Sequence, residues 1–342
     1  MPARENSVIA RCTHVCRHAI LPLLLLLLLS GCVENRANML NAAGPAAARI
    51  NVLWWLMFGL GALVYLAVMA YMLLALFRRR GSLEDAPQPA EGANIVVWGG
   101  AIIPALILIG VFGATVYTMD ALREPHIPDD MVVEVVGHQW WWEVRYPQQQ
   151  ITTANEIIIP AGRPVAFKLT SNDVIHSFWV PELHGKLDLL PEKVNTFWLQ
   201  ADEPGVYLGE CAEFCGVQHT KMQFLVIAVG DDEFRDWTEQ MAQPAPEPAG
   251  ELARRGQQVF LDSSCIYCHA VQGTDATGAL GPDLTHLASR RTLAAGTVPN
   301  TRGNLAGWIV DPQSIKPGSL MPPTTLSGPD LQALLAYLET LE

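Results

Sequence analysis

Charged residues are scarce in this chain. Asp, Glu, Lys and Arg make up 16% of its 342 residues, whereas hydrophobic residues make up 50%. Soluble globular proteins average about 25% charged residues. The shortage excludes an ordinary, fully soluble chain and predicts membrane-spanning segments beside two or three folded domains.

Positive charge is especially short. The chain has 22 Lys and Arg against 34 Asp and Glu, a net charge of -12. Residues 120–249 hold 21 acidic against 8 basic side chains, while residues 250–342 hold 8 against 6. This balance disfavours a nucleic-acid partner and suits a cationic one, with the middle of the chain as its acidic surface.

The N-terminus has the layout of an export signal. Three arginines precede a short apolar run at residues 21–29, which is too short for a comfortable membrane span. The string Leu-Ser-Gly-Cys that ends at Cys32 resembles the processing site of bacterial lipoproteins. We expect a lipoprotein-type signal peptide over residues 1–31 and lipidation of Cys32; the alternative is an ordinary signal with an incidental Cys32.

Two long apolar runs follow, at residues 50–77 and 95–119. Each reaches membrane-spanning length, and Pro104 is expected to kink the second run without breaking it. Three arginines at residues 78–80 place the connecting loop in the cytoplasm. We predict a transmembrane hairpin over residues 45–122 with both ends outside, rather than two buried core helices.

The residue pattern changes from long apolar runs to short ones over residues 123–232. Short β-branched and aromatic runs, punctuated by Pro and Gly, predict an all-β sandwich or Greek-key barrel. The expected strands include residues 131–136, 156–159, 164–169, 196–199 and 224–229.

The last loop of this β domain carries a set of soft ligands. Cys211 and Cys215 are followed by His219 and Met222, and His176 lies upstream between two strands. Thiolates, imidazoles and a thioether suit copper, and a second thiolate lets two sulfurs bridge two ions. Zinc is the next option, but a thioether is a poor zinc ligand. The alternative for the two cysteines is a disulfide in an oxidising compartment.

Residues 233–250 are rich in Pro, Ala, Glu and Gln, which is typical of a semi-rigid linker. A flexible linker of this length would let the following domain dock alternately at a donor and at the copper site.

Residues 251–342 have a mainly helical pattern and contain Cys265-Ile266-Tyr267-Cys268-His269. This spacing serves two thioether bonds to haem and an axial imidazole. Half of a zinc site or a thioredoxin-like pair are the alternatives, but neither a second C-x-x-C nor a βαβ pattern accompanies it. Met321 is the expected sixth ligand, because a thioether opposite His raises the reduction potential; otherwise it is a core methionine.

On these residues the chain resembles subunit II of haem-copper cytochrome c oxidases, over about residues 45–235. The motifs that carry the resemblance are Gly137-His138-Gln139-Trp140, His176-Ser177-Phe178 and the loop over residues 211–222. It implies a cupredoxin-like fold with a binuclear copper A centre, whose ligands would be His176, Cys211, the backbone carbonyl of Glu213, Cys215, His219 and Met222.

The same resemblance gives two further residues a role. The carboxylate of Glu213 would point toward a magnesium or water site shared with the next subunit. Trp140 would be the residue through which electrons enter; the alternative is a packed core or interfacial tryptophan.

The C-terminal residues 251–342 resemble a small all-α class I cytochrome c. The resemblance implies that Gly281–Leu284, a helix around Trp308 and the loop Lys316–Pro322 enclose the haem. The whole layout resembles the fused subunit of caa3-type oxidases. Electrons would pass from cytochrome c or another donor to haem c, then to copper A and to the catalytic subunit I that reduces oxygen. No catalytic residue is expected in this chain.

One position departs from the family pattern. Proton-pumping members often have Glu three residues before the Trp that opens the second membrane helix; here that Trp is Trp98, and Ile95 holds the position. The proton route is therefore open, and so is a role in a copper-A-dependent nitric oxide reductase. A membrane-tethered copper-delivery protein is a third hypothesis. We place the chain in the bacterial inner membrane, multi-pass, in contact with lipid and further oxidase subunits, with the copper and haem domains on the periplasmic side.

Overall fold

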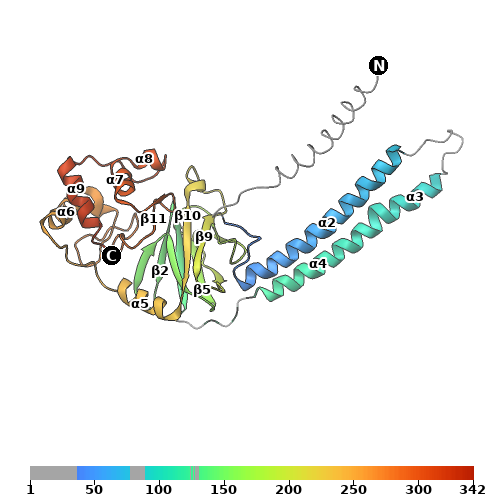
Figure 1. Ribbon diagram of the computed structural model, residues 1–342, viewed down its shortest axis with the longest axis horizontal. Coiled ribbons are helices and arrows are strands. Elements are labelled where there is room, and N and C mark those ends of the chain that lie inside the picture. Colours follow the sequence, from blue (N-terminus) through green and yellow to red (C-terminus); the bar gives the residue numbers. More distant parts are fainter. Residues whose placement is uncertain (1–36, 78–88, 124, 126, 128–130) are drawn as a thin grey trace, which may run out of the picture. The chain divides into compact units, whose positions relative to one another are not determined.

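The computed structural model describes residues 37–77, 89–123, 125, 127 and 131–342 (Figure 1). The predicted signal peptide, Cys32 and the three arginines at 78–80 lie outside the described residues.

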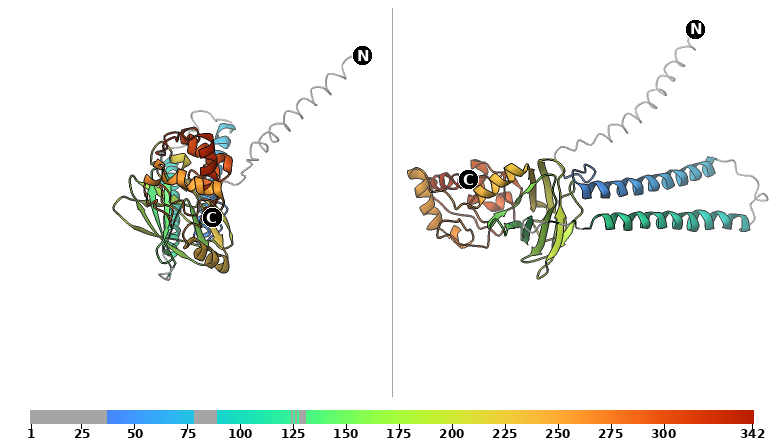
Figure 2. Two further views of the ribbon diagram at one scale, coloured as in Figure 1. Left: turned by 90° about the vertical axis from the view of Figure 1, so that its left-hand side faces the viewer. Right: turned by 90° about the horizontal axis from the view of Figure 1, so that it is seen from below.

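Two apolar helical stretches form the hairpin. They are α2 (Pro45–Phe77) and a second stretch made of α3 (Pro89–Val97), η2 (Trp98–Ile102) and α4 (Ile103–Ala121). Both are long and apolar enough to cross a membrane, and their large side chains are exposed. Helices α2 and α4 lie side by side (Figures 1 and 2). Exposed apolar surface over the length of both helices favours a lipid environment over a soluble core.

The second stretch continues through Pro104 without a break. Pro104 stands in the first turn of α4, and the turn before it, η2, is π-helical, with the Ile103 N–H donating to the Trp98 carbonyl. A proline lacks the N–H of an α-helical bond and its ring crowds the carbonyl four residues earlier, which a wider turn accommodates. Ile95 lies in α3 with its side chain exposed.

The β domain consists of two five-stranded sheets packed face to face. The first sheet has the order β3-β2-β1-β5-β8: β1 (Val132–His138), β2 (Trp141–Tyr146), β3 (Ile151–Ala154), β5 (Val165–Ser171) and β8 (Asn195–Leu199). The second has the order β4-β10-β9-β6-β7: β4 (Glu156–Pro160), β6 (His176–Trp179), β7 (Leu187–Leu189), β9 (Gly205–Cys211) and β10 (Gln223–Val229). Strands β1 and β5 pair in parallel, as do β4 and β10. The prediction of a Greek-key sandwich is confirmed.

An aromatic core holds the two sheets together. Trp142, Phe178 and Phe224 are fully buried, with ring centroids 4.4 to 5.9 Å apart. Fully buried residues alternate with less buried ones along β1 and β5, which turns one face of their sheet toward this core. The ring of Trp142 also lies 5.9 Å from the ring of His176, so the core ends against the candidate copper site.

The prediction of a linker over residues 233–250 is wrong for its first half. Residues 231–241 form helix α5 (Asp231–Met241), which opens with three acidic side chains that suit a helix N-terminus. Trp237 packs on Tyr146 with ring centroids 5.0 Å apart. The second half has no regular secondary structure but is hydrogen-bonded: the Ala245 N–H donates to the Gln272 carbonyl at 2.9 Å, and His286 Nε2 donates to the Gln243 carbonyl at 3.1 Å.

The C-terminal residues form a small, mainly helical domain. Its elements are α6 (Glu251–Leu261), η4 (Ser264–Tyr267), the short strands β11 (Thr292–Leu293) and β12 (Val298–Pro299), α7 (Arg302–Val310), α8 (Pro312–Ile315) and α9 (Gly328–Leu338). Helices α6 and α9 cross at Gly256. A Cβ at that position would fall against the Ala333 carbonyl and 2.8 Å from the Cβ of Tyr337. The crossing therefore depends on the missing side chain.

We expect Gly256→Ala to destabilise the C-terminal domain by about 1–3 kcal/mol, because the α9 backbone must move to admit one methyl group. The matched change Gly303→Ala meets no atom within 4 Å in α7, and should be neutral or stabilising because alanine favours helix. Calorimetric unfolding of the purified full-length chain measures both. Equal midpoints for the two variants would show that α6 and α9 are not in close contact at Gly256.

Candidate copper centre and haem site

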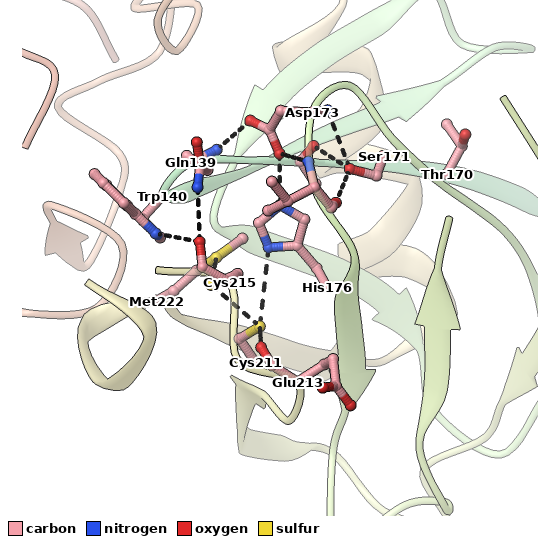
Figure 3. Close-up of polar contacts among 12 residues, drawn as sticks. Gln139, Trp140, Thr170, Ser171, Asp173, His176, Cys211, Glu213, Cys215 and Met222 are labelled. Carbon is pink, nitrogen blue, oxygen red and sulfur yellow. Dashed lines mark hydrogen bonds and ion pairs between the residues drawn. The ribbon is translucent and has the colours of Figure 1, made fainter. Parts of the chain in front are cut away.

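The predicted copper ligands converge at one end of the sandwich. His176 begins β6, Cys211 ends β9, and Cys215 and Met222 come from the loop before β10 (Figure 3). His219 opens the short helix η3 (His219–Lys221) in the same loop. His176, Cys211 and Cys215 are buried and hold their ligand atoms within 4.8 Å of one another.

The donor atoms divide into two sets around the two sulfurs. The Sγ of Cys211 lies 3.9 Å from His176 Nδ1 and 3.2 Å from the Glu213 carbonyl oxygen. The Sγ of Cys215 lies 3.8 Å from His219 Nδ1 and 3.8 Å from Met222 Sδ. The two sulfurs are 3.8 Å apart and both cysteines are free, whereas a disulfide bond is about 2.0 Å long. Each thiol thus has its own imidazole and one weaker donor.

Outside this set, a hydrogen-bond network fixes the imidazole and the loop (Figure 3). His176 Nε2 donates to Asp173 Oδ1 at 2.8 Å, which leaves Nδ1 facing Cys211. The other carboxylate oxygen of Asp173 accepts from the Gln139 N–H at 2.6 Å. The carbonyl of Cys215 accepts from Gln139 Nε2 at 2.7 Å and from Trp140 Nε1 at 3.0 Å. Such partners orient a metal-ligating histidine and hold its tautomer.

Two glycines let these groups approach one another. A Cβ at Gly137 would lie 2.8 Å from the His176 ring. Gly216 has a φ of +125°, which is reserved for glycine, and a Cβ there would lie 2.9 Å from the Trp140 ring. The loop after Cys215 can therefore turn tightly beneath Trp140.

The network changes the acidity of the donors. The Cys215 thiol lowers the pKa of Cys211 to about 3, and His176 adds to the effect. Burial opposes the charge on Asp173, but hydrogen bonds from His176 and two backbone N–H groups lower the pKa of its carboxyl. A thiolate is the form of cysteine that binds metal, and these contacts favour the thiolate of Cys211.

The C-terminal domain arranges a second set of ligands. Cys265 lies in η4, and the N–H groups of Cys268 and His269 donate to its carbonyl at 3.1 and 2.9 Å. His269 Nδ1 donates to the Pro282 carbonyl at 2.7 Å, so Nε2 is the nitrogen that would bind a haem iron. Burial lowers the pKa of His269, which keeps the ring neutral as a ligand.

The surroundings of His269 fit a haem. A Cβ at Gly281 would lie 2.7 Å from the His269 ring, so the Gly281–Leu284 segment lies directly against it. Arg290 is buried; one end of its guanidinium donates to the Asp283 carbonyl, and no described residue accepts from its Nε. A buried cation with an open donor suits a carboxylate such as a haem propionate. Met321 lies half-buried in the segment between α8 and α9.

Two known protein families match the two domains that carry these sites. The family described as "Cytochrome C oxidase subunit II, periplasmic domain" matches residues 148–229, and the family "Cytochrome c" matches residues 253–342. The chain is 40% identical over 327 residues to "Cytochrome c oxidase subunit 2" of Alkalihalophilus pseudofirmus, covering 93% of this chain and 95% of the relative. The chain belongs to the cytochrome c oxidase subunit II family. The protein of the same name from Bacillus subtilis is 33% identical, covering 92% of this chain and 95% of its own length.

A solved structure, the periplasmic domain of subunit II of cytochrome oxidase from Bradyrhizobium japonicum, is 28% identical and covers 34% of this chain and 96% of its own, with a TM-score of 0.33.

Family membership confirms the prediction of a subunit II fused to a cytochrome c domain. The chain is thus part of a haem-copper oxidase, an oxidoreductase complex. The two matches imply copper A in the sandwich and haem c in the C-terminal domain.

Sequence reasoning missed the residues that support the ligands. Asp173 lies three positions before His176, and an acidic side chain so close to a candidate ligand was a usable signal. Gln139 was inside a quoted motif without a role. Arg290 gave no signal, because only the fold buries it beside Asp283.

Proposed function

We propose that this chain is the subunit through which electrons enter a caa3-type oxidase. Haem c would be held by Cys265, Cys268, His269 and Met321, and copper A by His176, Cys211, the Glu213 carbonyl, Cys215, His219 and Met222. The haem supplies a one-electron carrier and the copper pair a one-electron relay. Electrons from cytochrome c or another donor would pass through both to the catalytic subunit I, which reduces oxygen to water.

The division of donors between two sulfurs carries this proposal. One ion needs one thiolate for a blue-copper site, whereas here each sulfur has its own imidazole and its own weaker donor. A two-copper centre would be held by every donor in the set, namely both cysteine sulfurs, both histidines, Met222 and the Glu213 carbonyl. Hydrogen bonds orient His176 and hold the Cys215 loop, which would limit the rearrangement that accompanies electron transfer.

Burial supports a relay over copper delivery. The exposed fractions of His176, Cys211 and Cys215 are 0%, 6% and 3%. A delivery site must release its ion to another protein, which requires access to the donors. Donors enclosed by a sandwich core suit a resident ion.

The surroundings would follow the family layout. We place the chain in the bacterial inner membrane through the two apolar helices, with Cys32 lipidated and the copper and haem domains on the periplasmic side. The Glu213 side chain is exposed and points away from the sulfurs (Figure 3), which leaves it free to reach a magnesium site shared with subunit I. Trp140 donates to the carbonyl of Cys215, which supports its role in conducting electrons to copper.

Metal and haem content of the purified complex tests the proposal. We expect two copper ions in this subunit and one covalently bound haem c per chain, with a mixed-valence copper signal in electron paramagnetic resonance. Haem without copper would reduce Cys211 and Cys215 to structural cysteines and leave a membrane-anchored cytochrome.

A further inference from the structure

A buried carboxylate of the sandwich accepts hydrogen bonds from the C-terminal domain. Glu156, at the start of β4, is 6% exposed. Its Oε1 accepts from the N–H of Arg291 at 2.8 Å, the N–H of Thr292 at 2.9 Å and the Thr292 hydroxyl at 3.1 Å. Three donors converge on one oxygen, so the bond set forms only when β11 lies at one position against β4.

A buried lysine of the C-terminal domain makes the reverse contact. Lys316 is 3% exposed, and its Nζ donates to the Trp140 carbonyl at 2.7 Å and to the Ala294 carbonyl at 3.2 Å. Sandwich side chains reach back to the same loop: Lys221 Nζ donates to the Ile315 carbonyl at 2.6 Å, and Gln218 donates to the Pro317 carbonyl.

Further contacts join the two domains in the region between Glu156 and Lys316. The Gln223 N–H at the start of β10 donates to the Ala295 carbonyl at 3.0 Å. A Cβ at Gly296 would lie 2.8 Å from the Cβ of Gln223, and one at Gly318 would lie 2.7 Å from Val217. The two domains are thus in contact from Glu156 to Lys316, inside the compact unit 37–342.

The charges specify a position more than they add affinity. Taking a carboxylate and an ammonium out of water costs several kcal/mol each unless hydrogen bonds replace the lost water. Glu156 regains those bonds from two backbone N–H groups and one hydroxyl of the opposite domain, and Lys316 from the Trp140 carbonyl of the opposite domain and the Ala294 carbonyl of its own. A shifted docking would take the Glu156 carboxylate away from its three donors and leave Lys316 with the Ala294 carbonyl alone, so displaced arrangements are disfavoured.

This docking places the haem-ligand loop against the copper loop. Lys316 opens the Lys316–Pro322 segment that carries Met321, and it bonds to the backbone of Trp140. Trp140 in turn donates to the carbonyl of Cys215. One tryptophan therefore bridges a loop of the proposed haem site and a proposed copper ligand.

We propose that Glu156 and Lys316 together hold the C-terminal domain at a single fixed position on the sandwich, so that it does not swing on a linker between a donor and the copper site. The inference rests on the proposed function only for the meaning of that position, because the contacts themselves involve no cofactor.

Hydrogen exchange of the backbone amides tests whether Glu156 and Lys316 act as such a clamp between the two domains. It is measured by mass spectrometry on the full-length chain with its cofactors. Glu156→Ala removes the acceptor, and the amides of Arg291 and Thr292 should exchange about tenfold faster or more. Glu156→Gln keeps one acceptor oxygen and should restore part of the protection. Glu233→Ala, an exposed residue of α5, is the matched control and should change nothing.

Lys316→Met gives the decisive reading. Lys316 makes no bond to Arg291 or Thr292, so faster exchange of their amides in this variant requires that both charges hold one rigid docking. Lys193→Met, at an exposed position, is its control. Unchanged exchange at 291–292 in Lys316→Met would overturn the clamp, as would unprotected amides there in the unmodified chain. Amides of α9 and β9 should stay protected in every variant, which separates undocking from unfolding.

Copper and haem content of the same samples keeps the two proposals apart. If the chain binds both cofactors but Lys316→Met leaves exchange at Arg291 and Thr292 unchanged, only the proposal of a fixed docking is overturned. If Lys316→Met speeds exchange at Arg291 and Thr292 but the chain binds no copper, only the proposed electron-entry function is overturned.

Discussion

Cys211→Ser is expected to remove the mixed-valence copper signal and nearly all bound copper, while covalent haem stays at the level of the unmodified chain. Serine has almost the same shape as cysteine, so the sandwich should fold, but its hydroxyl is a poor ligand for copper. His176 and the Glu213 carbonyl would be the donors left on the Cys211 side of the site, and Cys215 would be its one remaining thiolate. Copper analysis and electron paramagnetic resonance of the purified full-length chain give the result.

Met222→Leu is the graded control for this prediction. Met222 Sδ lies on the Cys215 side of the site and is a weaker donor than either thiolate. We expect this variant to keep its copper with an altered spectrum and to slow the reoxidation of haem c. If Cys211→Ser instead retained full copper with an unchanged signal, Cys211 would not be a ligand.

Local patterns predicted much of the sandwich. The expected strands at 131–136 and 224–229 appear as β1 and β10, because β-branched and aromatic runs bounded by turns are a local signal. Strand β6 is only four residues long, and the pattern missed it although it carries His176. Its place follows from pairing with β7 and β9, which is a property of the whole fold.

The ligand motifs could also be recognised in the sequence, because Cys211, Cys215, His219 and Met222 lie within one short loop. The long-range contacts that hold the loop and its surroundings in place could not be recognised there. Asp173 meets Gln139 across 34 residues, Glu156 meets Arg291 across 135, and Lys316 meets Trp140 across 176. No local composition distinguishes Glu156 and Lys316 from solvated charged residues, because only the folded chain brings their partners to them, whereas Asp173 could be noticed through its place three residues before His176.

The linker shows how composition misleads. Pro, Ala, Glu and Gln suggested an extended tether, yet residues 231–241 form a helix. Phe234 and Trp237 are three positions apart, the spacing of one helix face, and both pack against the sandwich core. That spacing was available in the sequence and outweighs the polar composition around it. With the second half bonded to Gln272 and His286, little free chain remains for a swinging motion.

Replacing both Cys265 and Cys268 with Ala is expected to abolish covalent haem and leave copper binding intact. The two thiols are free and half-buried, Cys265 within η4 and Cys268 directly after it, and no other described pair of cysteines has their C-x-x-C spacing. All proposed copper donors lie between residues 176 and 222, and their distances involve no atom of the C-terminal domain. Haem staining after denaturing electrophoresis, with copper analysis of the same sample, measures both effects.

Tyr267→Phe is the matched control inside the same motif. Tyr267 lies between the two cysteines with its side chain 72% exposed, so this variant should keep its covalent haem. Haem that survives denaturation in the double alanine variant would show that attachment uses other residues. Loss of copper together with haem would show that the sandwich needs a loaded C-terminal domain to complete its site. That outcome has a physical route, because Lys316 and Gln218 connect the haem-ligand loop to Trp140 and to the copper loop. Retained copper would instead show that the donors around Cys211 and Cys215 are positioned by the sandwich alone.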